Sequence, residues 1–156
     1  MSNIEQDAKL WMMDELYGIK AVPPDEDSES FTKAVLICAK GDGTISSEER
    51  AWFVGCSAAY QNAKGYELSK SYTGDDDLQK VLEGSANVAT QKGRLITLYV
   101  AIKACSSDAD YHPDEQKKIR KMATLLGIEE SVVKEIEQLC VEEAAIRQKR
   151  LSLLSD

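Results

Sequence analysis

Apolar residues recur at helical spacing along most of the chain, and no stretch alternates apolar and polar residues as a half-buried strand would. The pattern predicts helices over residues 3–17, from 28 or 30 to 40, from 47 onward, over 77–89, 95–105 and 113–126, and from 129 or 131 toward the C-terminus. Segment 61–77 shows no clear pattern. We therefore expect an all-α fold of about seven helices joined by short links.

Local residues mark where several of these helices begin and end. Ser46 and Glu49 form a capping-box pattern at a helix start, and Pro113 suits a first helical position. The glycines at 41 and 43 permit a sharp turn after residue 40, and Gly127 suits the position just past a helix end.

One phrase occurs twice, sixty-six positions apart. Residues 42–49 (DGTISSEE) are echoed by residues 108–115 (DADYHPDE), and the register continues without gaps into the preceding helices, where 33–39 superimpose on 99–105. The repeat predicts two similar helical hairpins, 28–62 and 94–128, packed about a pseudo-twofold axis. Residues 1–156 would form one helical domain, with an N-terminal helix and linker (1–27) and a C-terminal helix (129–156).

The composition and charge of the chain limit the classes of molecule that we expect it to bind. The chain has 156 residues, 43% of them apolar and 29% charged, which is typical of a globular domain. A net charge of −8 argues against nucleic acid as a partner. No apolar run is long enough to cross a membrane, and the first residues are acidic and polar, so we expect a cytoplasmic protein with no transmembrane segment. The four cysteines stand singly, which favours reduced thiols.

Packing the hairpins face to face would gather carboxylates from both loops. Asp42, Glu49, Asp108 and Glu115 are the candidates for one acidic cluster, with Glu48, Asp110 and Asp114 as second-rank groups. Carboxylates at close range repel one another, and a hard divalent cation relieves that repulsion. The all-oxygen set predicts a metal site for calcium, magnesium or manganese and argues against zinc or copper.

Helix capping explains part of the same pattern. Glutamate at the third helical position caps backbone N–H groups, and aspartate is favoured in turns, so metal binding and capping both remain open. An EF-hand reading fails because Cys38 and Lys40 would occupy ligand positions. A di-iron bundle fails because the single histidine, His112, has no Glu-x-x-His partner; a helix-start role explains it better.

At these residues the chain resembles the tellurite-resistance TerB-like family. That family shows an alanine-rich helix, then Asp-Gly, then glutamate opening the next helix, as in residues 39–49 and again around 108–115. The resemblance covers about 31–139 and implies an all-α fold of two similar halves with an acidic surface that binds divalent cations. By that resemblance Asp42, Glu49, Asp108 and Glu115 are the ligands. Ala109 departs from the family's glycine.

The resemblance and the residues together predict a non-enzymatic, divalent-cation-binding helical domain that acts as a stress-response or scaffold component. Its partners would be other proteins of a stress-response complex. The alternative is a metal-free protein–protein interaction module, favoured by the acidic surface and the partly apolar tail, 151–154. An enzyme using a metal-activated water lacks any recognisable substrate motif. The sequence leaves the oligomeric state open.

Overall fold

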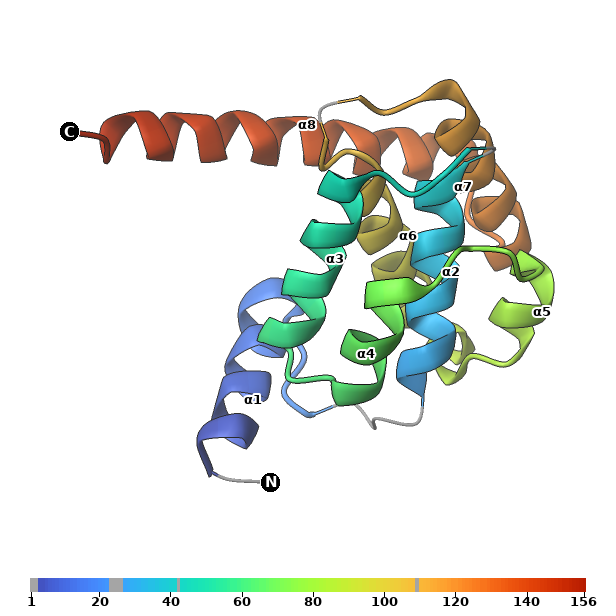
Figure 1. The fold of residues 1–156 in the computed structure, drawn as a ribbon, viewed down its shortest axis with the longest axis horizontal. Coiled ribbons are helices and arrows are strands. Elements are labelled where there is room, and N and C mark those ends of the chain that lie inside the picture. The colour runs from blue at the N-terminus through green and yellow to red at the C-terminus, as the bar shows by residue number, and fades with distance from the viewer. Residues whose placement is uncertain (1–2, 23–26, 42, 109) are drawn as a thin grey trace.

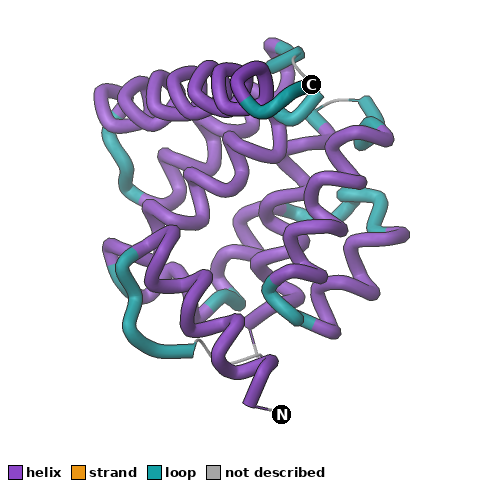
Figure 2. The backbone as a smooth tube through the Cα atoms, turned by 90° about the vertical axis from the view of Figure 1, so that its left-hand side faces the viewer, coloured by secondary structure: helices purple, strands orange, loops and turns teal. Residues whose placement is uncertain are grey.

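The chain folds into helices, as the periodicity predicts. The computed structural model describes residues 3–22, 27–41, 43–108 and 110–156, and within these ranges it contains eight α-helices, one 3-10 helix and no strand (Figures 1 and 2). In chain order the elements are α1 (Asn3–Tyr17), α2 (Ser28–Lys40), α3 (Ser47–Ala59), α4 (Ala63–Ser71), α5 (Leu78–Glu83), η2 (Ala86–Ala89), α6 (Gln91–Cys105), α7 (Pro113–Leu126) and α8 (Glu130–Leu153).

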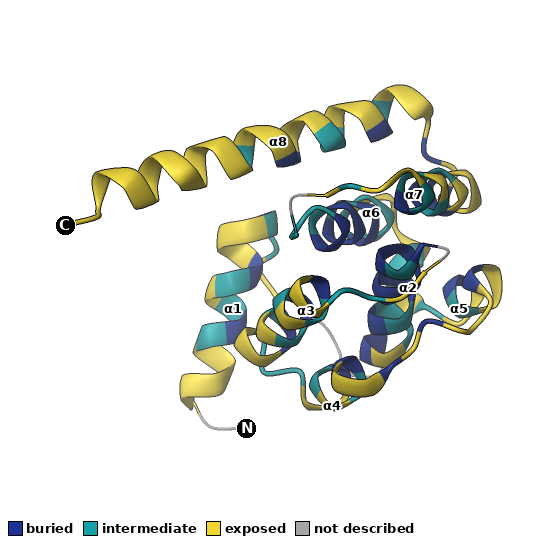
Figure 3. Ribbon diagram, turned by 45° about the horizontal axis from the view of Figure 1, so that its top comes forward, coloured by how far each residue is buried: buried dark blue, intermediate teal, exposed yellow. Residues whose placement is uncertain are grey.

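Helices α2 and α6 form the centre of the molecule (Figure 3). Residues 34–39 of α2 are each at most 2% exposed, and Leu98, Ala101 and Ile102 of α6 are fully buried. Because α2 packs against α4, α5, α6 and α7, it is apolar on nearly every side. The helices that the repeat superimposes are therefore the two that build the core. A twofold axis between the halves stays a prediction.

The predicted helix ends are confirmed. Helix α3 begins after the capping box at Ser46, and α7 begins at Pro113. Gly127 ends α7 with a left-handed φ of 69°, and Gly41 follows α2 with a φ of 56°. These positive φ values are ones that a side chain with a Cβ atom rarely adopts.

Two segments differ from the prediction. The helix expected over 77–89 breaks at Gly84, whose N–H bonds to the carbonyl oxygens of Lys80 and Val81, so that α5 and η2 are separate. Helix α6 starts at Gln91, four residues before the expected start, because the Thr90 hydroxyl accepts from the Gly93 N–H at 3.0 Å.

Segment 61–77, which has no clear sequence pattern, contains helix α4. Asn62 caps it by accepting a hydrogen bond from the Gly65 N–H at 3.2 Å. The helix is only nine residues long and buries only Gly65 and Ser69, so it has almost no apolar face to recognise. Helix α4 raises the number of α-helices in the described chain to eight, where about seven were expected.

Helix α8 packs on α6 and α7 with its first half and then projects from the body (Figures 1 and 3). Its buried residues are Val133 and Cys140, and every residue from 144 to 156 is exposed. Across the part of the chain that the structure describes, no helix combines the length and the apolar character needed to cross a membrane.

Candidate functional site

The two repeated glutamates cap the helices that they open. The Glu49 Oε1 atom accepts from the Ser46 N–H at 2.9 Å, and the Ser46 hydroxyl accepts from the Glu49 N–H at 3.1 Å. In the second copy, Glu115 Oε1 accepts from the His112 N–H at 2.9 Å. The capping explanation of both glutamates is therefore confirmed.

Capping uses only one oxygen of each carboxylate. Glu49 is 2% exposed and Glu115 is 5% exposed, and the buried Oε2 atom of each has no hydrogen-bond partner among the described residues apart from a proton shared between the two carboxylates and the nearby Cys105 thiol. A buried acceptor without a partner is unfavourable by about 1–3 kcal/mol, and more when it is charged. Capping alone therefore does not account for why both second oxygens are buried.

The two carboxylates lie within hydrogen-bonding reach of each other. Burial is the largest cause that raises the pKa of Glu115 to about 9, and Glu49 contributes to the same rise both as a hydrogen-bonding neighbour and as a negative charge. The hydrogen bond from the His112 N–H opposes this shift, and the charge of Asp108 adds to it. In the absence of a cation, Glu115 therefore holds a proton at neutral pH.

A close approach between the first loop and α7 brings the glutamates together. A Cβ atom on Gly41 would lie 3.2 Å from the Asp114 Cβ and 3.2 Å from the Glu115 backbone nitrogen. Glycine at this position therefore lets the loop after α2 lie directly on the start of α7. This contact places the residue that precedes the first repeated motif against the second motif.

The structure describes only one of the two aspartates of the predicted cluster. Asp108 accepts from the Asp110 N–H at 3.0 Å in a turn, and it acts on Glu115 as a nearby negative charge. Asp42 lies outside the described residues. Among the residues that are described, no group of three or more histidine, cysteine, aspartate or glutamate side chains is placed to hold a metal ion. The four-carboxylate site therefore stays a prediction.

The second-rank acidic residues have other interactions. Asp110 and Glu48 are exposed, and Glu48 accepts from the neighbouring Ser47 hydroxyl at 3.2 Å. Asp114 lies 3.6 Å from His112 and 4.0 Å from Lys117. His112 caps α7, since its Nδ1 atom accepts from the Asp114 N–H at 3.1 Å. The predicted helix-start role of this histidine is confirmed.

Two buried thiols lie close to the glutamate pair, which the sequence did not reveal. Cys38 and Cys105 are 0% exposed; Glu115 acts as a negative charge on both, and it is also a hydrogen-bonding neighbour of Cys105. Burial raises the pKa of Cys38 to about 12 and that of Cys105 well above its ordinary value. All four cysteines are free thiols, as predicted. The thiols nearest the site are therefore protonated and unreactive.

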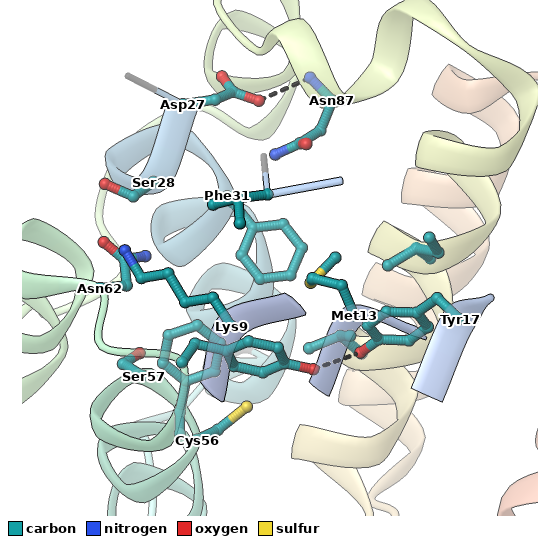
Figure 4. A pocket seen from close by; sticks show the side chains of 15 residues that line it. Lys9, Met13, Tyr17, Asp27, Ser28, Phe31, Cys56, Ser57, Asn62 and Asn87 are labelled. Atoms are coloured by element: carbon teal, nitrogen blue, oxygen red, sulfur yellow. Dashed lines mark hydrogen bonds between the residues drawn. The ribbon is translucent and has the colours of Figure 1, made fainter. Parts of the chain in front are cut away.

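A cavity of about 140 Å³ lies between α1, α2, α3 and α6, at the opposite end of α3 from Glu49 (Figure 4). Its walls are largely apolar. The polar groups around it mostly serve the fold: Asp27 accepts from the Ala86 and Asn87 N–H groups, and the Tyr60 hydroxyl donates to Tyr17 at 3.1 Å. The glutamate pair is therefore the stronger candidate site.

Comparison with known proteins gives one close match in structure. The crystal structure of a tellurite resistance protein from Nostoc punctiforme PCC 73102 is 41% identical, covers 99% of this chain and 96% of its own, and has a TM-score of 0.86. No protein-family profile and no curated protein sequence matches the chain. An identity of 41% over essentially the whole length shows common descent as well as a common fold. The chain therefore belongs to the TerB-like tellurite resistance family.

Proposed function

We propose that the protein binds a divalent cation between Glu49 and Glu115. The observation that supports this proposal is the pair of buried Oε2 atoms, which belong to neighbouring carboxylates and, when both are ionised, accept no hydrogen bond from each other. Each glutamate is already oriented by its capping bond, so the second oxygens are held in place before any cation arrives.

A bound cation would neutralise the repulsion between the two buried carboxylates. Two buried carboxylates side by side must share a proton or bind a positive ion, because burying both charges unpaired is strongly unfavourable. Protons and cations then compete for the same oxygens, so binding releases protons and strengthens as pH rises.

Oxygen ligands favour calcium, magnesium or manganese. Such an ion needs more ligands than two carboxylates provide. Asp108, which acts electrostatically on Glu115, and Asp42, which follows Gly41 in the sequence, are the acidic candidates for further ligands that the repeat supplies. Water and backbone carbonyl oxygens would complete the shell. A bound cation would supply charge neutralisation at the point where the loop after α2 meets α7.

The proposed role is structural and non-enzymatic, in a stress response of the tellurite-resistance kind. Membership of the family supports the role in a stress response, since the related crystal structure is named a tellurite resistance protein. The position of the site supports a structural role, because the glutamates lie at the starts of α3 and α7 and a cation there would join the two repeated halves.

Thermal unfolding in the presence and absence of cation tests the proposal. Calcium, magnesium or manganese should raise the Tm of chelator-treated protein, and Glu49→Gln or Glu115→Gln should abolish that rise. Glu48→Gln is the matched control, because Glu48 neighbours Glu49 but is exposed. Asp108→Asn and Asp42→Asn should weaken the response. An equal rise in wild type and in both glutamate variants would contradict the proposal.

A further inference from the structure

Helix α8 presents an apolar seam, from the end of its packed first half to its C-terminal end, that nothing in the described chain covers. Glu143 is held by the Tyr99 hydroxyl at 2.8 Å and by Lys103 at 3.2 Å, and past this point α8 leaves the body (Figure 1). The seam consists of three residues whose exposed fractions are 45%, 62% and 74%: Leu139, Ile146 and Leu153.

The spacing of the seam is that of a helix that pairs with another helix. Its three residues are seven positions apart, which places them on one side of α8 over about 21 Å. One exposed apolar residue per heptad forms a narrow stripe along α8, which a short contact with a second helix would bury. A solvated helix has no need of such a repeat.

The charges of α8 are arranged in opposite order on the two sides of Ile146. Glu142 and Glu143 precede it, and Lys149 and Arg150 follow it at equal distances. Neither Lys149 nor Arg150 takes part in an ion pair between described residues. The segment is therefore complementary in charge to a reversed copy of itself.

We propose that α8 pairs with α8 of a second copy of this chain, antiparallel and centred on Ile146. In this register Leu139 of one copy faces Leu153 of the other, and Ile146 faces its own equivalent on the twofold axis. Glu142 of each copy then faces Arg150 of the other. A parallel pair would instead place like charges together, which is unfavourable. The pairing is independent of the cation site.

Sedimentation velocity over a micromolar concentration series tests the seam. Wild type should show a reversible monomer–dimer equilibrium, because an interface of two heptads is small. Ile146→Asp should raise the dimer dissociation constant at least ~30-fold, since it puts two charges at the centre of the contact. The matched control is Val141→Asp: Val141 is also 62% exposed but lies about 140° around the helix from Ile146, and this variant should dimerise like wild type.

A charge exchange tests the antiparallel register. Glu142→Lys alone and Arg150→Glu alone should each weaken dimerisation, because each creates two like-charged pairs. Mixing the two single variants should restore a dimer, since both cross-pairs then have opposite signs. All substituted residues are exposed, so circular dichroism should show an unchanged fold in every variant.

Several outcomes would overturn the pairing. A wild type that stays monomeric through the series would do so, as would equal effects of the Ile146 and Val141 substitutions. Mixed charge variants that associate no better than each variant alone would exclude the antiparallel register.

Discussion

Replacing Glu115 with glutamine separates the electrostatics of the carboxylate pair from the capping bond. The amide oxygen can still accept from the His112 N–H, and the amide NH₂ group can donate to the Glu49 carboxylate, whose Oε2 is buried without a described partner. The substitution therefore removes a buried titrating group and supplies a missing donor. We expect Glu115→Gln to stabilise the metal-free protein at neutral pH.

The raised pKa of Glu115 gives the size and the pH dependence of this effect. The pKa rises from 4.5 to about 9, so at pH 7 the folded protein binds a proton that the unfolded chain does not. The pKa of Glu115 is higher in the folded protein than in the unfolded chain. The stability that proton binding contributes is therefore complete below pH 4.5 and is lost as the pH rises toward 9. At pH 7 the free energy of unfolding has fallen by about 3 kcal/mol, because each pH unit between the two pKa values removes about 1.36 kcal/mol.

Glutamine does not titrate, so the advantage of Glu115→Gln should be near zero at about pH 4.5 and about 3 kcal/mol at pH 7, or roughly 6–12 °C in Tm. Urea unfolding with chelator, followed at several pH values, measures it. The control Glu48→Gln should stay within about 0.5 kcal/mol of wild type throughout. A destabilising Glu115→Gln at pH 7, or an effect that does not change with pH, would refute the paired-carboxylate geometry.

Two glycines and one thiol give three further predictions. Gly41→Ala should destabilise the protein by about 1–3 kcal/mol, because its φ is positive and the new Cβ would press on Asp114 and Glu115. Gly55→Ala, in the middle of α3 with no atom within 4 Å of its new Cβ, should instead stabilise by about 0.5–1 kcal/mol in the same urea assay. Burial raises the pKa of Cys56 from 9.0 to about 11, so iodoacetamide should label it about a hundredfold more slowly than an unshifted thiol at pH 8, with a rate that rises as pH increases. Fast labelling of Cys56 by mass spectrometry at pH 8 would contradict its burial.

The local signals in the sequence predicted the helix ends well. Ser46, Pro113 and Gly127 act within one helical turn, so their roles follow from neighbouring residues alone. Gly84 and Thr90 also act locally, but the apolar periodicity that continues across them hides the break between α5 and η2 and the early start of α6. Helix α4 is missed because it is short and buries little apolar surface.

The site was predicted only in part, for a different reason. The sequence indicated that Glu49 and Glu115 are equivalent, and it allowed both capping and metal binding. It did not indicate that each carboxylate caps a helix with one oxygen and buries the other, because that depends on how closely the loop at Gly41 approaches α7. The thiols of Cys38 and Cys105 near the pair belong to helices that are distant in sequence, so only the packing of α2 on α6 reveals them.

Calorimetric titration in two buffers of different ionisation enthalpy tests the central claim most directly. Calcium, magnesium or manganese titrated into metal-free protein at pH 7 should bind with one ion per chain and release about one proton, the one held by Glu115. Glu49→Gln and Glu115→Gln should lose this binding, while Glu48→Gln should keep it. Absence of binding heat for all three cations, or binding of equal strength in the two glutamate variants, would contradict a cation site at the carboxylate pair.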